Sequence, residues 1–222
     1  MTASVTSNDR FARQHELVPA ERLAKLLVTV IGVGSIGRQV ARTLAAIGAR
    51  RIQLVDFDHV EDTNRTTQGY SLADVGQLKV KATAADIARL DPSVEVELVA
   101  DRYRPKLEVG QAVFCCVDSI ETRAAIWRSV GRKVQFWADG RMLADTIRVL
   151  VAADEVGRAH YPTTLFPGSE AHAGRCSAMN TFDSAQIAAG LLIHNFRRWL
   201  RALPVDSDFS FNVLASELIV HC

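Results

Sequence analysis

The chain of 222 residues has little cysteine, little net charge and no long apolar run. Its four cysteines, Cys115, Cys116, Cys176 and Cys222, form no C-x-x-C pair, so the sequence predicts neither a disulfide framework nor a structural zinc site built from this chain alone. No apolar run reaches the roughly 18 residues that a membrane-spanning helix needs, and no signal peptide opens the chain. The formal net charge of +1 gives no reason to expect nucleic acid or a membrane surface as a partner. We therefore expect a cytoplasmic globular protein.

One stretch, Val28 to Asp58, carries the pattern of a nucleotide-binding strand–turn–helix–strand unit. An apolar run leads into a G-x-G-x-x-G turn made by Gly32, Gly34 and Gly37. A helix is expected to begin near Ile36, and its positive end would face a phosphate that lies over the turn. Asp56 ends the second strand 24 residues after Gly32, where such folds place a carboxylate that binds ribose. The stretch therefore predicts a nucleotide site in a Rossmann-like fold.

The rest of the sequence predicts an α/β fold with a mostly parallel sheet, helices on both faces and a few additional antiparallel strands. A buried strand is expected at Ala112–Val117 and a helix at Lys79–Leu90. Residues 145–153 alternate as a strand outside the parallel set, and residues 209–220 as one or two closing strands. On the helix after the glycine turn, the polar face is expected to carry Arg38, Gln39 and Arg42.

Two stretches, 58–78 and 154–180, show no sustained period. A polar connection of this length is more often functional than idle. The chain shows no internal repeat and no low-complexity linker, so we expect a single domain over residues 1–222, with a helical N-terminal arm at 1–25 and a long crossover-type loop at 154–180.

Polar side chains gather where the predicted strands end. Asp56 and Asp58 follow the second strand, Asp118 follows the buried strand, and the loop between them adds three more candidates and a lysine: Asn64, Arg65, Gln68 and Lys79. Strand carboxyl ends are where ligands bind in an open α/β sheet. Hydride transfer needs an apolar nicotinamide slot, whereas acids, amides and cations suit a triphosphate and its metal. The set therefore favours phosphate chemistry.

Several short motifs, taken in order over about residues 10–200, resemble one family. They are R-F-A-R-Q at Arg10–Gln14, G-V-G-S-I-G at Gly32–Gly37, D-F-D-x-V at Asp56–Val60, Asn64 and Gln68, G-Q-L-K at Gly76–Lys79, L-D-P at Leu90–Pro92, C-V-D-S-I-E-T-R at Cys116–Arg123 and C-S-A-M-N-T at Cys176–Thr181. The chain resembles the ThiF/MoeB/ubiquitin-activating (E1-like) adenylyltransferases. D-G-R-M at Asp139–Met142 resembles a prokaryotic subgroup of them.

The resemblance implies ATP and Mg²⁺ as cofactors. It implies that the three glycines admit the ATP phosphates, that Asp56 binds the ribose hydroxyls, that Asn64 and Lys79 contact phosphate oxygens and that Asp118 holds Mg²⁺. Asp58 and Gln68 are further candidates for the nucleotide site, although Asp58 also fits a simple turn residue. Asp118 also fits the N-cap of the following helix, and one residue can have both roles.

The resemblance also implies a reaction and its partners. A small ubiquitin-like protein would present its C-terminal glycine carboxylate to the α-phosphorus of ATP, giving an acyl-adenylate and pyrophosphate. The family's homodimer would place Arg13 in the neighbouring subunit's site. Cys176 aligns with a cysteine that takes the activated carrier in some members, and an unremarkable loop thiol is the alternative. The expected catalytic residues are thus Arg13, Lys79, Asp118 and Cys176.

The chain departs from the family pattern at two places. Thr67 stands where the family usually has a phosphate-clamping arginine, and we hypothesise that Arg65 substitutes for it. The two C-x-x-C zinc pairs are missing, as they are in many members. Three other functions stay open: an NAD-dependent oxidoreductase, an enzyme that adenylates a non-protein substrate such as a tRNA base, and a binding module with an inactive site.

Overall fold

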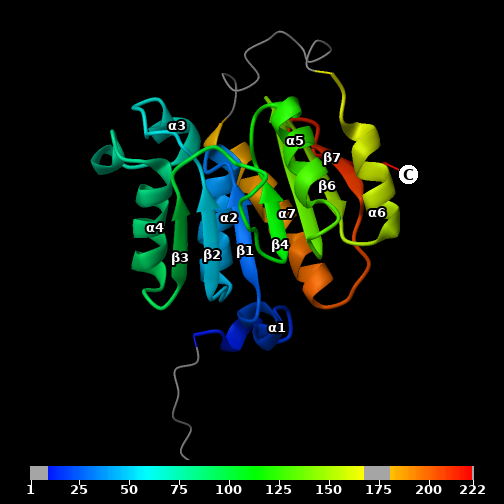
Figure 1. Ribbon diagram of the computed structural model, residues 1–222, viewed down its shortest axis with the longest axis horizontal. Helices are drawn as coiled ribbons and strands as arrows, with labels where there is room; N and C mark the ends of the chain where they lie inside the picture. Colours follow the sequence, from blue (N-terminus) through cyan, green and yellow to red (C-terminus); the bar gives the residue numbers. More distant parts are fainter. Residues whose placement is uncertain (1–9, 168–180, 222) are drawn as a thin grey trace, which may run out of the picture.

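The computed structural model describes residues 10–167 and 181–221, which fold around an eight-stranded sheet in the order β3-β2-β1-β4-β5-β6-β7-β8 (Figure 1). The strands are β1 (Leu27–Ile31), β2 (Arg51–Val55), β3 (Glu95–Val99), β4 (Ala112–Cys115), β5 (Phe136–Leu143), β6 (Thr146–Ala152), β7 (Asp208–Asn212) and β8 (Glu217–Val220). Strands β1 to β5 pair in parallel, and β6, β7 and β8 are added antiparallel. The predicted α/β fold class is therefore confirmed.

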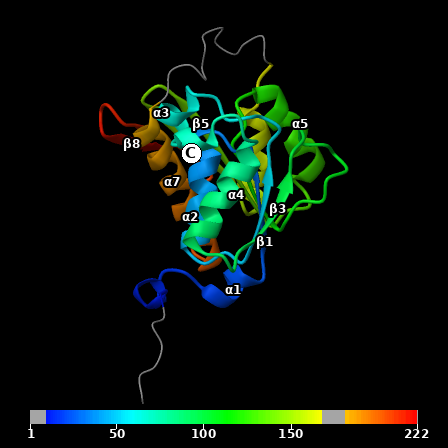
Figure 2. The same ribbon diagram turned by 90° about the vertical axis from the view of Figure 1, so that its left-hand side faces the viewer.

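Helices cover both faces of this sheet, as Figure 2 shows. One face carries α2 (Ser35–Ala46), α4 (Lys79–Leu90) and α7 (Phe182–Leu200), and the other carries α5 (Ile120–Val130) and α6 (Glu155–His160). The central strands are buried on both faces, which fits the continuous apolar run of β4 and the mostly apolar sequence of β1. Phe114 and Phe136 pack against Phe196 of α7, and Trp137 and Tyr161 pack on the α5 side.

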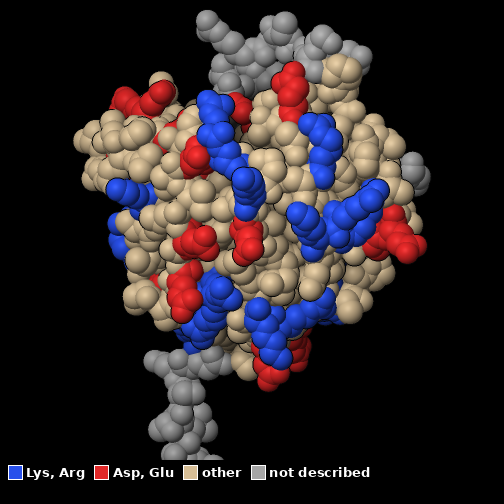
Figure 3. All heavy atoms as spheres, in the orientation of Figure 1, with Lys and Arg blue, Asp and Glu red and all other residues tan. Residues whose placement is uncertain are grey.

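The sheet direction sets where a ligand can bind. The carboxyl ends of the parallel strands meet at one edge, together with α3 (Asn64–Gln68) and η2 (Leu72–Asp74). The N-terminal elements η1 (Ala12–Gln14) and α1 (Ala20–Ala24) lie at the opposite edge, at the bottom of Figure 1. Basic and acidic groups are interspersed over the face in Figure 3. In the part of the chain that the structure describes, no helix is long and apolar enough to cross a membrane.

Most predicted elements are found, and three expectations are wrong. The helix at Lys79–Leu90 and the strand outside the parallel set are confirmed. The stretch 58–78 was expected without regular structure but contains α3 and η2, and residues 154–164 contain α6 and η3 (Tyr161–Thr164). Helices of three to six residues are too short to show a period. Arg38 and Gln39 are buried instead of lying on a solvated face, because a loop covers them.

Candidate functional site

Glycine is present at the three positions of the turn for different structural reasons. Gly32 has φ +87°, and a Cβ there would lie 2.7 Å from the Cys116 carbonyl oxygen. A Cβ on Gly37 would lie 1.8 Å from the Gly32 carbonyl oxygen. These two glycines are therefore required by the fold. A Cβ on Gly34 would meet nothing closer than 3.8 Å, where the Gln68 Oε1 atom lies. Gly34 keeps space open above the turn at the start of α2, where an anion is favoured.

Asp56 ties the turn to the end of β2. Its carboxylate accepts hydrogen bonds from the backbone N–H groups of Val33, at 2.6 Å, and Asp58, at 2.8 Å. Burial raises the pKa of Asp56 above its ordinary value, and the two backbone N–H groups oppose that rise. The residue is 8% exposed, so Asp56 is largely removed from water at the end of β2.

A cavity of about 450 Å³ opens beside Asp56, between the end of β2 and the start of α4. It is lined by Phe57, Asp58, His59, Glu61, Asn64 and Lys79. The Lys79 side chain is 10% exposed, and its Nζ lies 3.1 Å from the Asp58 carboxylate. Asn64 accepts the Glu61 N–H group at 2.9 Å through its oxygen. Three of the predicted site residues, Asp58, Asn64 and Lys79, are thus brought together in one polar hollow.

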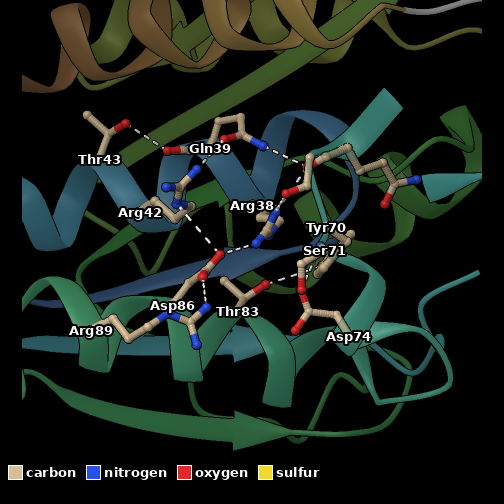
Figure 4. Close-up of polar contacts among 12 residues, drawn as sticks. Arg38, Gln39, Arg42, Thr43, Tyr70, Ser71, Asp74, Thr83, Asp86 and Arg89 are labelled. Carbon is tan, nitrogen blue, oxygen red and sulfur yellow. Dashed lines mark hydrogen bonds and ion pairs between the residues drawn. The ribbon is translucent and has the colours of Figure 1, made fainter. Parts of the chain in front are cut away.

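Gln68 lies over the glycine turn at the end of α3. Its Oε1 atom is buried and, among the described residues, has no hydrogen-bond partner. Its carbonyl oxygen accepts from Gln39 Nε2 at 2.9 Å and from Arg38 Nη1 at 3.3 Å (Figure 4). Buried polar atoms are normally paired, so an orphaned oxygen beside Gly34 marks a place where a ligand group can bind.

Asp118 and Arg65 are more open. Asp118 is exposed two residues before the start of α5, and the N-cap of α5 is Ser119, so the capping interpretation of Asp118 is wrong. Its carboxylate has no hydrogen bond or ion pair to another side chain within residues 10–167 and 181–221. Arg65 pairs with Asp62 at 2.7 Å and does not line the cavity. The structure therefore leaves Asp118 available and turns Arg65 towards Asp62.

Arg13 lies far from the glycine turn of its own chain. The adjacent Gln14 donates from Nε2 to the Ile47 carbonyl oxygen at 2.9 Å, at the C-terminal end of α2. The turn is at the other end of this helix of 12 residues, roughly 18 Å away. Arg13 is exposed there. Cys176 lies outside the described residues.

The comparisons with known proteins decide the family. A family model described as "ThiF family" matches residues 10–193, which is most of the chain. The chain belongs to the ThiF family. The glycine turn, the cavity, Gln68 and Asp118 all lie inside the matched region.

Curated relatives of this ThiF-family chain are named as activating enzymes and adenylyltransferases. "Ubiquitin-like modifier-activating enzyme 5" of Caenorhabditis elegans is 23% identical over 220 residues, covering 88% of this chain and 52% of the relative. "Probable adenylyltransferase/sulfurtransferase MoeZ" of Mycobacterium tuberculosis is 34% identical over 167 residues, covering 62% of this chain and 43% of the relative. The chain spans about half the length of these and similar curated relatives that it matches.

Solved structures show the same fold. E. coli MccB, in a crystal structure with ATP, superposes with a TM-score of 0.74 at 17% identity, covering 97% of this chain and 72% of MccB. A crystal structure of PaaA gives a TM-score of 0.75 at 19% identity, covering 100% of this chain and 76% of PaaA. These likenesses extend the Rossmann-like ThiF fold over the antiparallel strands as well.

A second polar cluster of this ThiF-family chain supports the loop that carries Asp118. Buried Asp139 on β5 pairs with Arg123 of α5 and with Arg141, at 2.9 Å, and accepts the Tyr161 hydroxyl at 2.9 Å. Arg123 also donates to the carbonyl oxygen of Val117. The Asp139 carboxylate is therefore fully engaged and is not free to bind a ligand, although Asp139 lies opposite Cys115, the last residue of β4.

Cys115, the last residue of β4, and Cys116, which follows it, both pack against apolar core residues. Cys115 is fully buried and Cys116 is partly exposed, and burial raises the pKa of both thiols. A raised pKa keeps a thiol protonated and a poor nucleophile.

Sequence reasoning missed Arg38, Gln39 and Tyr70. The Arg38 guanidinium lies 4.1 Å from the centre of the Tyr70 ring and is paired with Asp86 of α4 (Figure 4). Tyr70 donates its hydroxyl hydrogen to the Val33 carbonyl oxygen at 2.7 Å. The signal that pointed to them was weak: two polar residues just after the third glycine, on a helix whose neighbouring loop had no predicted structure.

Proposed function

We propose that the chain adenylates the C-terminal glycine carboxylate of a small ubiquitin-like protein, or of a peptide, with ATP. The observation that carries this proposal is the meeting of Lys79, Asn64 and Asp58 in one cavity beside the glycine turn. A cation and an amide suit phosphate oxygens, whereas a nicotinamide ring needs an apolar slot. The names of the curated relatives support the same reaction class.

ATP would bind along the carboxyl edge of the sheet. Asp56 would accept the ribose hydroxyls, and the open space over Gly34 would admit the phosphates, because a side chain is missing there and helix α2 begins there. Lys79 and Asn64 would hold phosphate oxygens in the cavity. Asp58 would keep Lys79 in place through their ion pair. Arg65 stays a candidate for the phosphate contact that the arginine missing at Thr67 would make, and an Arg65→Ala variant tests it.

Mg²⁺ would be held by Asp118 together with the phosphates. Within the described residues, no group of three His, Cys, Asp or Glu side chains could hold a metal ion alone. One exposed carboxylate nevertheless fits Mg²⁺, which commonly binds through one or two carboxylates, substrate phosphates and water. The ion would supply charge neutralisation at the reacting phosphate.

The reaction is an in-line displacement. A carboxylate oxygen of the carrier attacks the α-phosphorus, the bond to the bridging oxygen of the β-phosphate breaks, and pyrophosphate leaves. No proton has to move, so the work of the protein is to position both reactants and to stabilise negative charge. In a homodimer, Arg13 of one subunit would add positive charge to the site of the other.

A second step would move the activated carrier to Cys176. Its thiolate would attack the acyl carbon, forming a thioester and releasing AMP. Arg175, next to it in the sequence, would favour the thiolate. A Cys176→Ala variant should then keep the first step and lose a thiol-sensitive adduct with the carrier. Retention of the adduct would show that another residue accepts the carrier.

ATP–pyrophosphate exchange tests the first step. With small proteins that end in glycine as the second substrate, the wild type should incorporate labelled pyrophosphate into ATP. Lys79→Ala should lower the exchange rate about 100-fold or more, as expected for the loss of one charged contact to a phosphate. Lys81→Ala is the matched control, because Lys81 is exposed on the same helix and should exchange like the wild type. Equal loss in both variants, or none in either, would contradict the assignment of Lys79.

A further inference from the structure

The loop over the glycine turn is held from behind by two buried side chains of α2. Gln39 donates to the Gln68 carbonyl oxygen at 2.9 Å, and Arg38 donates to the carbonyl oxygens of Gln68, at 3.3 Å, and of Gly69 (Figure 4). Tyr70 closes the connection by donating to Val33 inside the turn at 2.7 Å. The peptide units from Gln68 to Tyr70 are therefore fixed relative to Gly34.

These contacts are unusual for a surface loop. Arg38 is 2% exposed and Gln39 is 5% exposed, so both polar groups have been removed from water. Removing a guanidinium from water is unfavourable unless its hydrogen bonds are satisfied. Apolar residues of similar size at such positions often stabilise a fold at least as much as the buried charged group does. Here Gln39 Nε2 and Arg38 Nη1 donate to backbone carbonyl oxygens of one loop, while Arg38 Nη2 pairs with Asp86 of α4. The arrangement fixes a position more than it adds stability.

The hydrogen bonds from Arg38 and Gln39 fix the backbone of Gln68 and so orient its side chain. Its Oε1 atom is buried without a partner, 3.8 Å from the place of a Gly34 Cβ. A half-turn about the Cγ–Cδ bond exchanges the oxygen and the nitrogen of the amide, so the same side chain offers N–H donors to an anion over the turn. A buried polar group without a partner is stabilised by any ligand group that pairs with it.

The sequence leaves a place for such a donor. Thr67 has no charge, and Arg65 lies two residues earlier, about 200° around α3, paired with Asp62. No other cation follows on α3 before Gly69. Gln68 is the residue of this helix whose side chain lies closest to Gly34 among the described contacts.

We propose that Arg38 and Gln39 are positioning residues of the nucleotide site: they hold the Gln68 backbone so that its amide donates to the phosphate chain over Gly34, in the place of a cation at position 67. This inference rests on the proposed function, because it requires a phosphate ligand. It adds that the phosphate contact is neutral and that its geometry is set from α2.

Titration calorimetry with ATP–Mg²⁺ tests the inference. Gln68→Ala should raise the dissociation constant about tenfold, as expected for one hydrogen bond to a charged group. Gln39→Met, which keeps the length of the side chain but cannot donate, should raise it several-fold. Gln77→Met is the matched control, because Gln77 lies in the same loop, is exposed and donates from its side chain to the Ala73 carbonyl oxygen.

The double variant separates positioning from general damage. If Gln39 acts through Gln68, then Gln39→Met should have no further effect on the dissociation constant in a Gln68→Ala background. Independent, multiplying effects would overturn the inference. If Gln39→Met does not fold, Gln68→Ala in the wild-type background still decides the role of the amide, because a dissociation constant equal to that of the wild type would overturn the inference.

Binding of ATP–Mg²⁺ by the wild type distinguishes a failure of this inference from a failure of the proposed function. If the wild type does not bind ATP–Mg²⁺, the proposed function itself is contradicted. Binding by the wild type with equal dissociation constants for Gln68→Ala and Gln39→Met would leave the function standing and remove the inference.

Discussion

At the scale of single residues, the second glycine of the turn separates fold from function. Gly37→Ala places a Cβ on the Gly32 carbonyl oxygen, and we expect it to destabilise the fold by several kcal/mol. Gly34→Ala meets nothing within van der Waals contact except the Gln68 amide. It should change the melting temperature by no more than about 2 °C, within the range of neutral substitutions, yet weaken ATP binding about tenfold or more.

Thermal unfolding and ATP titration of the two variants check this prediction. Gly76→Ala tests whether glycine loss in itself matters, because Gly76 has φ +83° with open space around its Cβ position. It should be destabilised moderately and bind ATP normally. ATP binding by Gly34→Ala with the wild-type affinity would mean that the phosphates do not lie over this glycine.

At the scale of elements, one ion pair ties the N-terminal arm to the end of α4. Asp91 accepts from Arg10, from Ser93 Oγ at 2.7 Å and from the Ser93 N–H group at 3.0 Å. The hydrogen bond from Arg10 is the main reason that the pKa of Asp91 is lowered well below its usual range. A lowered pKa in the folded state means that the ionised carboxylate stabilises the fold above its ordinary pKa of about 3.9.

We therefore expect Asp91→Asn to lower the free energy of unfolding at pH 7 by about 1 kcal/mol, a small value because Arg10 is half exposed. The difference from the wild type should shrink as the pH falls below about 4, towards the folded-state pKa. Urea unfolding from pH 7 to pH 2 measures it. Glu95→Gln, at an exposed pair, should show almost no difference at any pH. A constant difference for Asp91→Asn down to pH 2 would contradict the linkage.

The elements also show what the sequence could and could not predict. The helix at Lys79–Leu90 and the buried strand β4 follow from periodicity and from apolar runs, and both are found. Helix α3 has five residues and no apolar period, so only its contacts with α2 and α7 reveal it. Arg38 and Gln39 look like surface residues because burial by a distant loop leaves no local pattern.

The site was predictable only in part, because local sequence patterns reveal some of its residues and tertiary contacts place the others. Asp56, Asp58, Asn64 and Lys79 follow from strand ends and motif spacing, and the structure brings them to one edge. That Gln68 lies over Gly34, and that Arg65 turns to Asp62, depends on the angle at which α3 sits, which tertiary contacts decide.

At the scale of the whole molecule, the position of Arg13 bears on assembly. It lies at the far end of α2 from the turn, so it can serve a site only in another subunit. We expect Arg13→Ala and Lys79→Ala each to be inactive in pyrophosphate exchange. Mixed after subunit exchange, they should regain about a quarter of the wild-type rate, because half of the dimers are mixed and one site in each is intact.

Light scattering of the same samples gives the oligomeric state. An active monomeric wild type, or no recovery in a mixture shown to contain mixed dimers, would rule out the shared site. An Arg13→Ala variant with the wild-type rate would leave Arg13 as an ordinary surface residue.

The central claim is that the glycine turn faces a triphosphate and not a dinucleotide. Titration calorimetry of the wild type with ATP–Mg²⁺ and, separately, with NAD tests it most directly. We predict that one ATP binds per chain, that Asp118→Asn weakens this binding only when Mg²⁺ is present, and that NAD gives no saturable heat. Saturable binding of NAD with none for ATP–Mg²⁺ would contradict the account.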